Sequence, residues 1–247
     1  MNIPIGIVTK DRPVYLNETL NSILDTNCPI PTVYDDASEA ITSRRFLDTS
    51  DTFTVQHEWP TYQEWIDAGL SNLKDNPTLH GIDGKVDVIR IDSTSVGVVV
   101  ASCEAILDLF EMNPEAPAII LLQDDVIVVQ DWYEKLVSTF NGNRNLGILA
   151  GMHLNYRAHA NYYTAQCYLI TKSFFKSQRT WFEKKHTSRC NFDVKLCNEV
   201  NRSGFKVDVV NPYICQHIGV VSKVRPHRPF KTDKFIRMGL KDNCPLD

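Results

Sequence analysis

Short apolar segments alternate with amphipathic segments along the first 140 residues, and this alternation limits the possible folds more than any other feature of the sequence. The apolar segments have the length and β-branched content of buried strands, and they cover residues 3–9, 31–34, 86–91 and 118–122. The amphipathic segments repeat apolar residues at helical spacing, and they cover residues 14–24, about 60–75, 98–112 and 132–140. Strand, helix and strand in this order form parallel βαβ units, so the pattern predicts a doubly wound, mostly parallel α/β sheet flanked by helices.

The second half of the chain carries less regular elements. We expect strands at 146–154, 163–171, 206–210 and 213–217, and helices at 173–182 and 192–202. No linker is long enough to separate two independent domains. We therefore expect one continuous domain, with a smaller sheet in its second half and a basic C-terminal tail that starts at Ser222.

Charge is distributed unevenly between the two halves. Residues 151–247 hold 17 Lys and Arg against 7 Asp and Glu, whereas residues 1–150 hold 9 against 23. A basic half of this kind suits an anionic partner, although surface charge that segregates without a role would give the same count.

Two further features concern the cellular location. The sequence has no apolar stretch of about 18 residues, which a membrane span requires, and we see no secretory signal. Seven widely spaced cysteines without a CxxC pair indicate reduced thiols in a cytoplasm, which would be the host cytoplasm for a viral protein. A zinc site built from Cys190, Cys197, Cys215 and His217 is a weak alternative, because their spacing matches no zinc pattern.

Polar residues follow the predicted strands, and the most informative set is Gln123, Asp124 and Asp125. Two adjacent carboxylates at a strand end repel each other unless a cation neutralises them. A divalent ion is the simplest such cation, and oxygen ligands favour Mg²⁺ or Mn²⁺ that is shared with substrate phosphates. An aspartate pair that caps the turn into the next helix is the structural alternative.

A second pair, Asp35 and Asp36, ends the second predicted strand. Because the carboxyl ends of parallel strands meet at one edge of a sheet, this pair should lie near Thr9, Lys10 and Arg12. The acids can accept hydrogen bonds from a ring N–H or a ribose hydroxyl, and the other three residues can donate to phosphates. The edge therefore predicts a nucleoside diphosphate site, although neither GxGxxG nor GxxxxGK[ST] occurs in the chain.

These strings resemble a known family. In order, IPIGIVTKDRPVYLNETLNSIL, VYDDAS and IILLQDDV are similar to the nucleotide-sugar half of GT-A fold glycosyltransferases of the family-two type. The resemblance implies that residues 1–140 bind a nucleotide-diphosphate sugar, with UDP as the expected nucleotide, and that residues 141–247 bind the acceptor. The chain departs from the family where Gln123 replaces the first acid of an Asp-x-Asp motif. It departs again in residues 93–102, where the family often has Gly-Arg-Asn and this chain has Gly97 followed by Val98 and Val99.

The resemblance assigns roles in donor binding. By motif, Thr9 and Arg12 border the base, and Asp36 binds the uracil, with Asp35 as the alternative. The resemblance also implies that Asp124 lies near the ribose. In the same way Gln123 is expected to hydrogen-bond the ribose, and Asp125 is expected to ligate the Mn²⁺ or Mg²⁺ ion that holds the diphosphate.

Two residues of the second half complete this interpretation. Asp193, in the string NFDVKL, occupies the place of the family's general base, which would remove the acceptor proton in an inverting transfer. A helix N-cap is the alternative for Asp193. His217, in the string QHIG, resembles the histidine that completes the metal shell in GT-A enzymes, and the alternative is a core histidine.

The acceptor is expected to be a hydroxyl group on a polyanion. Basic residues occur together with aromatic residues in the second half, namely Arg179, Lys184, Lys185, Arg189, Lys223, Arg225, His227, Arg228, Lys231, Lys234 and Arg237 with Tyr156, Tyr162, Tyr163, Trp181 and Phe182. This combination suits a nucleic-acid strand, whose bases can stack on aromatic rings. We therefore expect a hexosyl- or pentosyltransferase that modifies a hydroxylated pyrimidine in DNA, as bacteriophage enzymes do. The alternatives are transfer to a glycan, protein or lipid-linked acceptor, and a catalytically silent nucleotide-binding or DNA-binding module.

Overall fold

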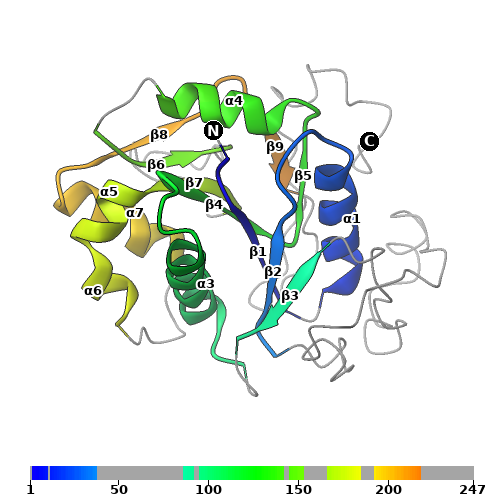
Figure 1. Cartoon of the computed structure of the whole chain (residues 1–247), viewed down its shortest axis with the longest axis horizontal. Helices are drawn as coiled ribbons and strands as arrows, with labels where there is room; N and C mark the ends of the chain where they lie inside the picture. Colours follow the sequence, from blue (N-terminus) through cyan, green and yellow to red (C-terminus); the bar gives the residue numbers. More distant parts are fainter. Residues whose placement is uncertain are drawn as a thin grey trace.

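The computed structural model of the chain describes seven segments, residues 2–10, 12–37, 86–91, 95–141, 145–152, 166–184 and 192–217. They form a mixed α/β fold in which a central seven-stranded sheet has helices on both faces (Figure 1). The expected helix near residues 60–75 and the basic tail lie outside the described residues.

Four parallel strands form one side of the sheet. They are β1 (Ile5–Thr9), β2 (Thr32–Asp35), β3 (Asp87–Arg90) and β4 (Ala118–Gln123). Their order in space is β3-β2-β1-β4, so the chain adds strands on one side of β1 and then crosses to its other side. This reversal is the point at which open α/β sheets bind ligands.

The second half of the chain extends the same sheet. The strand β7 (Cys167–Thr171) pairs antiparallel with β4, and β6 (Leu146–Ala150) and β8 (Lys206–Val209) follow it in the order β4-β7-β6-β8. The short strands β5 (Val126–Val128) and β9 (Cys215–His217) form a separate two-stranded sheet. Strands from both predicted halves therefore share one mostly parallel sheet, and the small second sheet pairs one strand from each half.

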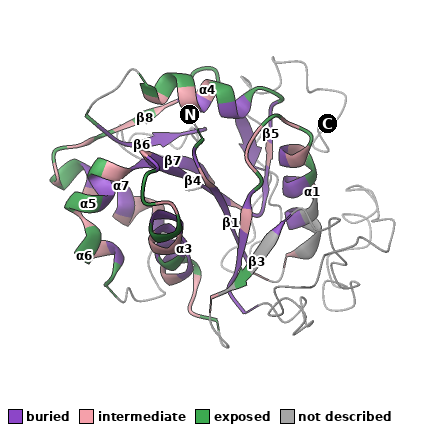
Figure 2. Cartoon of the chain, in the orientation of Figure 1, coloured by how far each residue is buried: buried purple, intermediate pink, exposed green. Residues whose placement is uncertain are grey.

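Helices cover both faces of the large sheet. On one face lie α1 (Pro13–Leu24) and α4 (Trp132–Asn141), which pack side chains such as Leu20 and Trp132 against the even-numbered residues of β4. On the other face lie α3 (Val98–Met112), α5 (Lys172–Ser177), α6 (Arg179–Phe182) and α7 (Phe192–Arg202). Nearly all residues of the central strands are buried (Figure 2), since both of their faces are covered.

Most of the expected elements are confirmed, some with shorter bounds. The helices at 98–112 and 192–202 have the expected limits. The expected helix at 173–182 is two helices that meet at Gln178, whose backbone leaves the helical region at φ −120° and ψ 22°. The strand β5 was not predicted, because three residues carry too short a pattern and its partner β9 lies about 90 residues further along the chain.

None of the helices in the described segments is long and apolar enough to cross a membrane.

Candidate functional site

Three polar residues meet where β1 and β4 end side by side. Thr9 ends β1, and Asp124 and Asp125 form the turn that directly follows β4. The register pairs Val8 with Gln123, so Thr9 and Asp124 occupy the next level at the carboxyl edge. This place is the reversal point of the strand order, where the sequence predicted the site.

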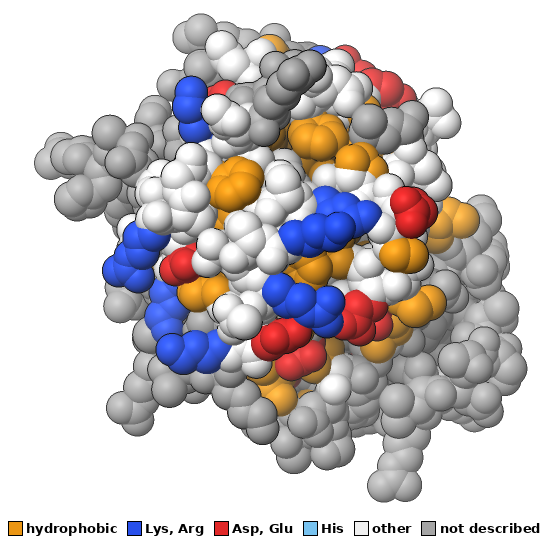
Figure 3. Space-filling view, turned by 60° about the vertical axis from the view of Figure 1, so that its left-hand side comes forward, with side chains coloured by type: hydrophobic (Ala, Val, Ile, Leu, Met, Phe, Trp, Pro, Cys, Tyr) orange, Lys and Arg blue, Asp and Glu red, His pale blue; other side chains and the backbone are white. Residues whose placement is uncertain are grey.

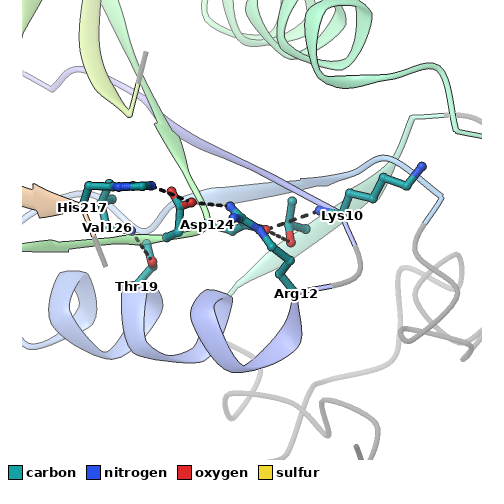
Figure 4. Close-up of polar contacts among 8 residues, drawn as sticks. Lys10, Arg12, Thr19, Asp124, Val126 and His217 are labelled. Carbon is teal, nitrogen blue, oxygen red and sulfur yellow. Dashed lines mark hydrogen bonds and ion pairs between the residues drawn. The ribbon is translucent and has the colours of Figure 1, made fainter. Parts of the chain in front are cut away.

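Asp124 binds the loop that connects β1 to α1. Its Oδ2 accepts a hydrogen bond from Thr9 Oγ1 at 2.7 Å and a longer one from the backbone N–H of Lys10 at 3.4 Å. Its Oδ1 forms an ion pair with Nη2 of Arg12 (Figure 4). The Asp124 side chain is almost fully buried, so these contacts supply the partners that water would otherwise supply.

Asp125 shares the same guanidinium and also contacts a histidine. Its Oδ2 accepts from Nη2 of Arg12 at 2.6 Å and lies 3.0 Å from Nε2 of His217, which β9 brings to this point. Within the described part of the chain, Asp125 Oδ1 and His217 Nδ1 are buried and have no hydrogen-bond partner. Buried polar atoms without a partner are rare, and an ion or a ligand at the site is one explanation for them.

The cluster shifts the pKa values of its members in different directions. Burial by itself lowers the pKa of Arg12, but the charges of Asp124 and Asp125 outweigh burial and raise that pKa, so the guanidinium stays charged. Burial raises the pKa of Asp124, and Arg12 only partly opposes this. Burial would also raise the pKa of Asp125, but Arg12 and His217 together hold it below its usual range.

The donor set suits a divalent ion only in part. Asp125 and His217 offer an oxygen and a nitrogen that lack partners, and this combination is compatible with Mn²⁺ or Mg²⁺. Within the described segments no three His, Cys, Asp or Glu side chains converge as a complete metal shell. The protein would thus provide a partial shell that substrate phosphates complete, and Arg12 already supplies one of the positive charges that the acid pair needs.

Asp36 has a different environment, although it directly follows β2, the strand on the other side of β1. Its Oδ1 accepts from the backbone N–H of Val96 at 2.7 Å, and its Oδ2 accepts from Ser95 Oγ at 2.9 Å and from the N–H of Gly97 at 3.0 Å. These three residues lead directly into α3, and Gly97 has φ 86° and ψ 154°, a conformation that favours glycine. Asp36 therefore clamps the start of α3. The uracil contact predicted for Asp36, or for the equally buried Asp35, stays a prediction.

Gln123 and Asp193 lie away from this cluster. Successive residues of a strand point to opposite faces, so Gln123 shares the face of Leu121, against which α3 and α7 pack, rather than the α1 face of Asp124. Asp193 is the second residue of α7, not the residue before it, and its Oδ1 accepts from the N–H of Val194 at 2.9 Å. Their predicted contacts with the ribose and the acceptor stay predictions.

The described part of the basic surface is not a single positive patch. Arg179 forms ion pairs with Glu183 and Glu111, and Phe182 is buried in the core. Figure 3 shows Lys and Arg side chains next to Asp and Glu side chains on the face it presents. Apart from Lys184 and Trp181, the other basic and aromatic residues expected to bind the acceptor lie outside the described residues.

The zinc alternative is not supported. Cys197 packs on the α7 face of the sheet, whereas Cys215 packs in the core on the α1 face. Both are free thiols, and Cys190 lies outside the described segments.

Sequence reasoning missed two features of this edge. It did not foresee that the guanidinium of Arg12 contacts both carboxylates of the second acid pair, and the contact with the base predicted for Arg12 stays a prediction. It also gave no role to Ser95 or Val96, which bind Asp36. The signal for Arg12 was present, because a cation after β1 and two acids after β4 must meet if the two strands are neighbours.

Comparison with known proteins supports the fold. No protein-family model and no curated protein matches the sequence. Among solved structures, the mannosyltransferase PcManGT from Pyrobaculum calidifontis, in complex with GDP-Man and Mn²⁺, matches with a TM-score of 0.56 at 9% identity, over 92% of this chain and 59% of that one. TarS from S. aureus matches with a TM-score of 0.52 at 11% identity in complex with UDP-GlcNAc, and with 0.51 at 12% identity in complex with UDP.

These matches have a limited extent. Both TarS matches cover 87% of this chain, but this chain spans only 58% and 60% of the TarS chains. At such low identity the likeness concerns architecture alone. The chain has the GT-A type of α/β fold that these glycosyltransferases share.

Proposed function

We propose that the protein is a glycosyltransferase that moves a sugar from a nucleotide-diphosphate sugar, with UDP as the first choice, to a hydroxyl acceptor. The observation that carries the proposal is the buried cluster of Arg12, Asp124, Asp125 and His217 at the reversal point of the sheet. Buried charges of this kind are costly for folding and are typical of sites that bind charged ligands. The structural neighbours, which bind GDP-Man or UDP-GlcNAc, add support for a nucleotide sugar.

A divalent ion fits this proposal. Asp125 and His217 would hold Mn²⁺ or Mg²⁺ with a carboxylate oxygen and a ring nitrogen, and their Oδ2 and Nε2 atoms already lie 3.0 Å apart. The ion would neutralise the diphosphate as it departs from the sugar. The two protein ligands leave most of the shell to phosphate oxygens and water, as is common for Mg²⁺ sites.

The chain's own residues would position the donor and the acceptor. Thr9 and the Asp35–Asp36 corner would border the nucleoside, while Gln123 and Asp124 would hold the ribose. Asp193 would accept the proton of the acceptor hydroxyl at its carboxylate as the oxygen attacks the anomeric carbon, which is the general-base role in an inverting transfer. Residues 1–140 would thus serve the donor and residues 141–247 the acceptor.

The first test is hydrolysis or transfer by the full chain. Purified protein is incubated with UDP-sugars and GDP-sugars in the presence of Mn²⁺, Mg²⁺ or EDTA, and the released nucleotide is measured. We expect release from at least one donor, and we expect EDTA to suppress it. If no donor is bound or hydrolysed under any of these conditions, the chain is a silent module and the proposal is wrong.

For the acceptor we propose a polyanion, with a hydroxylated pyrimidine in DNA as the sharpest version. The support comes from the 17 Lys and Arg against 7 Asp and Glu in residues 151–247 and from a cysteine pattern typical of a cytoplasmic protein. The test adds hydroxymethylated and unmodified DNA to the donor assay at several salt concentrations. Sugar on the hydroxymethylated strand alone would support DNA, whereas salt-independent transfer to a glycan, protein or lipid-linked acceptor would favour the alternative.

A further inference from the structure

Arg12 is the residue whose position the proposed function does not yet explain. One nitrogen, Nη2, contacts the carboxylates of both Asp124 and Asp125, and the Arg12 side chain is only 17% exposed. The guanidinium carbon also lies 5.3 Å from the centre of the Tyr15 ring. The guanidinium therefore neutralises part of the charge of the two carboxylates.

Charge limits what can be added to this cluster. The two carboxylates and the guanidinium together carry one negative charge. A divalent ion bound next to them would reverse that sign and leave an uncompensated positive charge in a buried place, which is costly. The ion would also compete with Arg12 for Asp125, since Asp125 Oδ2 already accepts from both Arg12 and His217.

A nucleoside diphosphate removes both obstacles. Its phosphates are negative and compensate the positive charge that a bound ion adds to the cluster. Their oxygens are also good acceptors for the planar fork of donors on an arginine. The Arg12 side chain has a long flexible stem that starts at the residue before α1, so its head can turn from the carboxylates to a ligand at the same edge. The carboxylates and the diphosphate, which are the two alternative partners of the guanidinium, would then lie within one site.

We propose that Arg12 makes metal binding depend on the nucleotide: its guanidinium holds the two carboxylates together until the donor binds, and it then transfers to the diphosphate, which releases Asp125 for the ion. This inference rests on the proposed function and deepens it. Arg12 is then a positioning residue that couples two ligands, and it prevents the acid pair from capturing a metal ion when no donor is present. Coupling between two ligands at one site is reciprocal, so the metal must strengthen nucleotide binding by the same factor.

The test measures Mn²⁺ binding instead of turnover. Free Mn²⁺ is followed by electron paramagnetic resonance in titrations of the full chain, with and without saturating UDP. For the wild type we expect UDP to tighten Mn²⁺ binding by roughly 5- to 150-fold, the usual range of coupling between sites. For Arg12→Met we expect Mn²⁺ alone to bind about tenfold more tightly than to the wild type, because its competitor is gone.

Two further variants make the result specific. Arg202→Met removes a 78% exposed arginine at the end of α7 and should bind Mn²⁺ like the wild type. Arg12→Lys keeps the charge but loses the fork, so its Mn²⁺ affinity without UDP should lie between those of the wild type and Arg12→Met. It also serves as the test if circular dichroism shows that Arg12→Met does not fold.

The possible failures can be told apart. If Mn²⁺ binds the wild type equally well with and without UDP, or if the Arg12 variants bind Mn²⁺ alone no more tightly than the wild type, this inference is overturned while the proposed function stands. If Arg12 is a permanent substitute for the metal, the wild type will bind UDP without binding Mn²⁺ at all, and the inference is again wrong. Absence of both UDP and Mn²⁺ binding would instead remove the proposed function.

Discussion

Two pairs of adjacent aspartates end the strands on either side of β1, and they have different environments. In the pair at the end of β2, the donors to Asp36 within the described segments are uncharged, namely two backbone N–H groups and one hydroxyl of the residues that lead into α3. In the pair after β4, Asp124 and Asp125 share the guanidinium of Arg12, and Asp125 also contacts His217. The two pairs are alike in sequence and in position at the sheet edge.

The difference shows which pair can exchange partners. Backbone N–H groups cannot leave Asp36 unless the start of α3 moves, so this carboxylate is part of the scaffold. A side-chain guanidinium can rotate away from Asp124 and Asp125, and Asp125 Oδ1 has no partner within the described residues. We therefore interpret the first corner as a support for α3 and the second as the reactive part of the edge.

The largest expected effect on activity comes from removing one negative charge from the pair Asp124 and Asp125. Asp125→Asn should lower metal-dependent release of nucleotide by at least about a thousandfold, because it removes the only protein carboxylate proposed to hold the ion. The matched control is Asp131→Asn, which changes an exposed aspartate paired with Lys135. If Asp125→Asn keeps its activity, the pair Asp124 and Asp125 is not the reactive part of the edge, and the difference drawn between the two pairs is wrong.

A third carboxylate should separate donor binding from transfer. Asp193→Asn keeps the shape of the side chain at the start of α7 but removes a base, so transfer should fall by about 10²- to 10⁴-fold. The affinity for UDP with Mn²⁺, measured by calorimetry, should stay within about twofold of the wild type, since Asp193 lies on the other face of the sheet. A normal transfer rate would place the base elsewhere.

A moderate effect on stability is expected at the scaffold corner. Asp36→Ala leaves the N–H groups of Val96 and Gly97 without their acceptor and should lower the free energy of unfolding by about 3 kcal/mol, measured with urea. Asp36→Asn should lower it by about half as much, because an amide oxygen can replace one of the two acceptors. If Asp36→Asn keeps full stability but loses affinity for UDP, the interpretation of Asp36 as a support for α3 is wrong. That result would support the predicted uracil contact.

The smallest effect concerns a thiol that reports on α3. Burial raises the pKa of Cys103 to about 12, and the nearby Glu104 adds to this, so the thiol is protonated at neutral pH. The folded pKa lies above the ordinary value of 9.0, so the resulting contribution to stability is present in full below pH 9 and is lost as the pH rises towards 12. At pH 8 we expect very slow alkylation of Cys103 by iodoacetamide.

Alkylation can also show whether the clamp at Asp36 acts on α3. In Asp36→Ala the reaction of Cys103 should become about thirtyfold faster, which corresponds to about 2 kcal/mol of easier local opening. Cys28, a partly buried thiol between α1 and β2, serves as the internal control in the same mass spectra. Equal rates for Cys103 in the variant and the wild type would mean that the clamp does not stabilise the helix.

Local patterns were sufficient for the helices and strands that have a full period of apolar residues. The helix α3 was predicted with its limits because its apolar residues recur at helical spacing and Asn113 ends it. In the structure eight of its residues are buried. The strand β5 and the break at Gln178 were missed, because the first depends on pairing with distant β9 and the second interrupts a run of aromatic residues that reads as one helix.

For the site, the sequence identified the acids but not their partners. Adjacent aspartates after an apolar strand predicted a divalent ion at Asp124 and Asp125, and this ion stays a prediction. In the structure the guanidinium of Arg12 contacts both carboxylates. The order of the strands would have placed Arg12 near these acids, but the sequence does not give the side-chain conformation with which one nitrogen contacts both. In the same way, nothing in the string VYDDAS shows that residues 95–97 lie beside Asp36, and the nucleoside contact predicted for Asp36 stays a prediction.

The sequence by itself determined the doubly wound α/β class and the sheet edge at which polar residues gather, because strand and helix periods and the polar residues after each strand are local properties of the chain. Only the tertiary structure decided which aspartate pair supports α3 and which pair shares Arg12. The physical reason is that the partners of a carboxylate come from segments 59 to 115 residues away, and their approach depends on the order of the strands around β1.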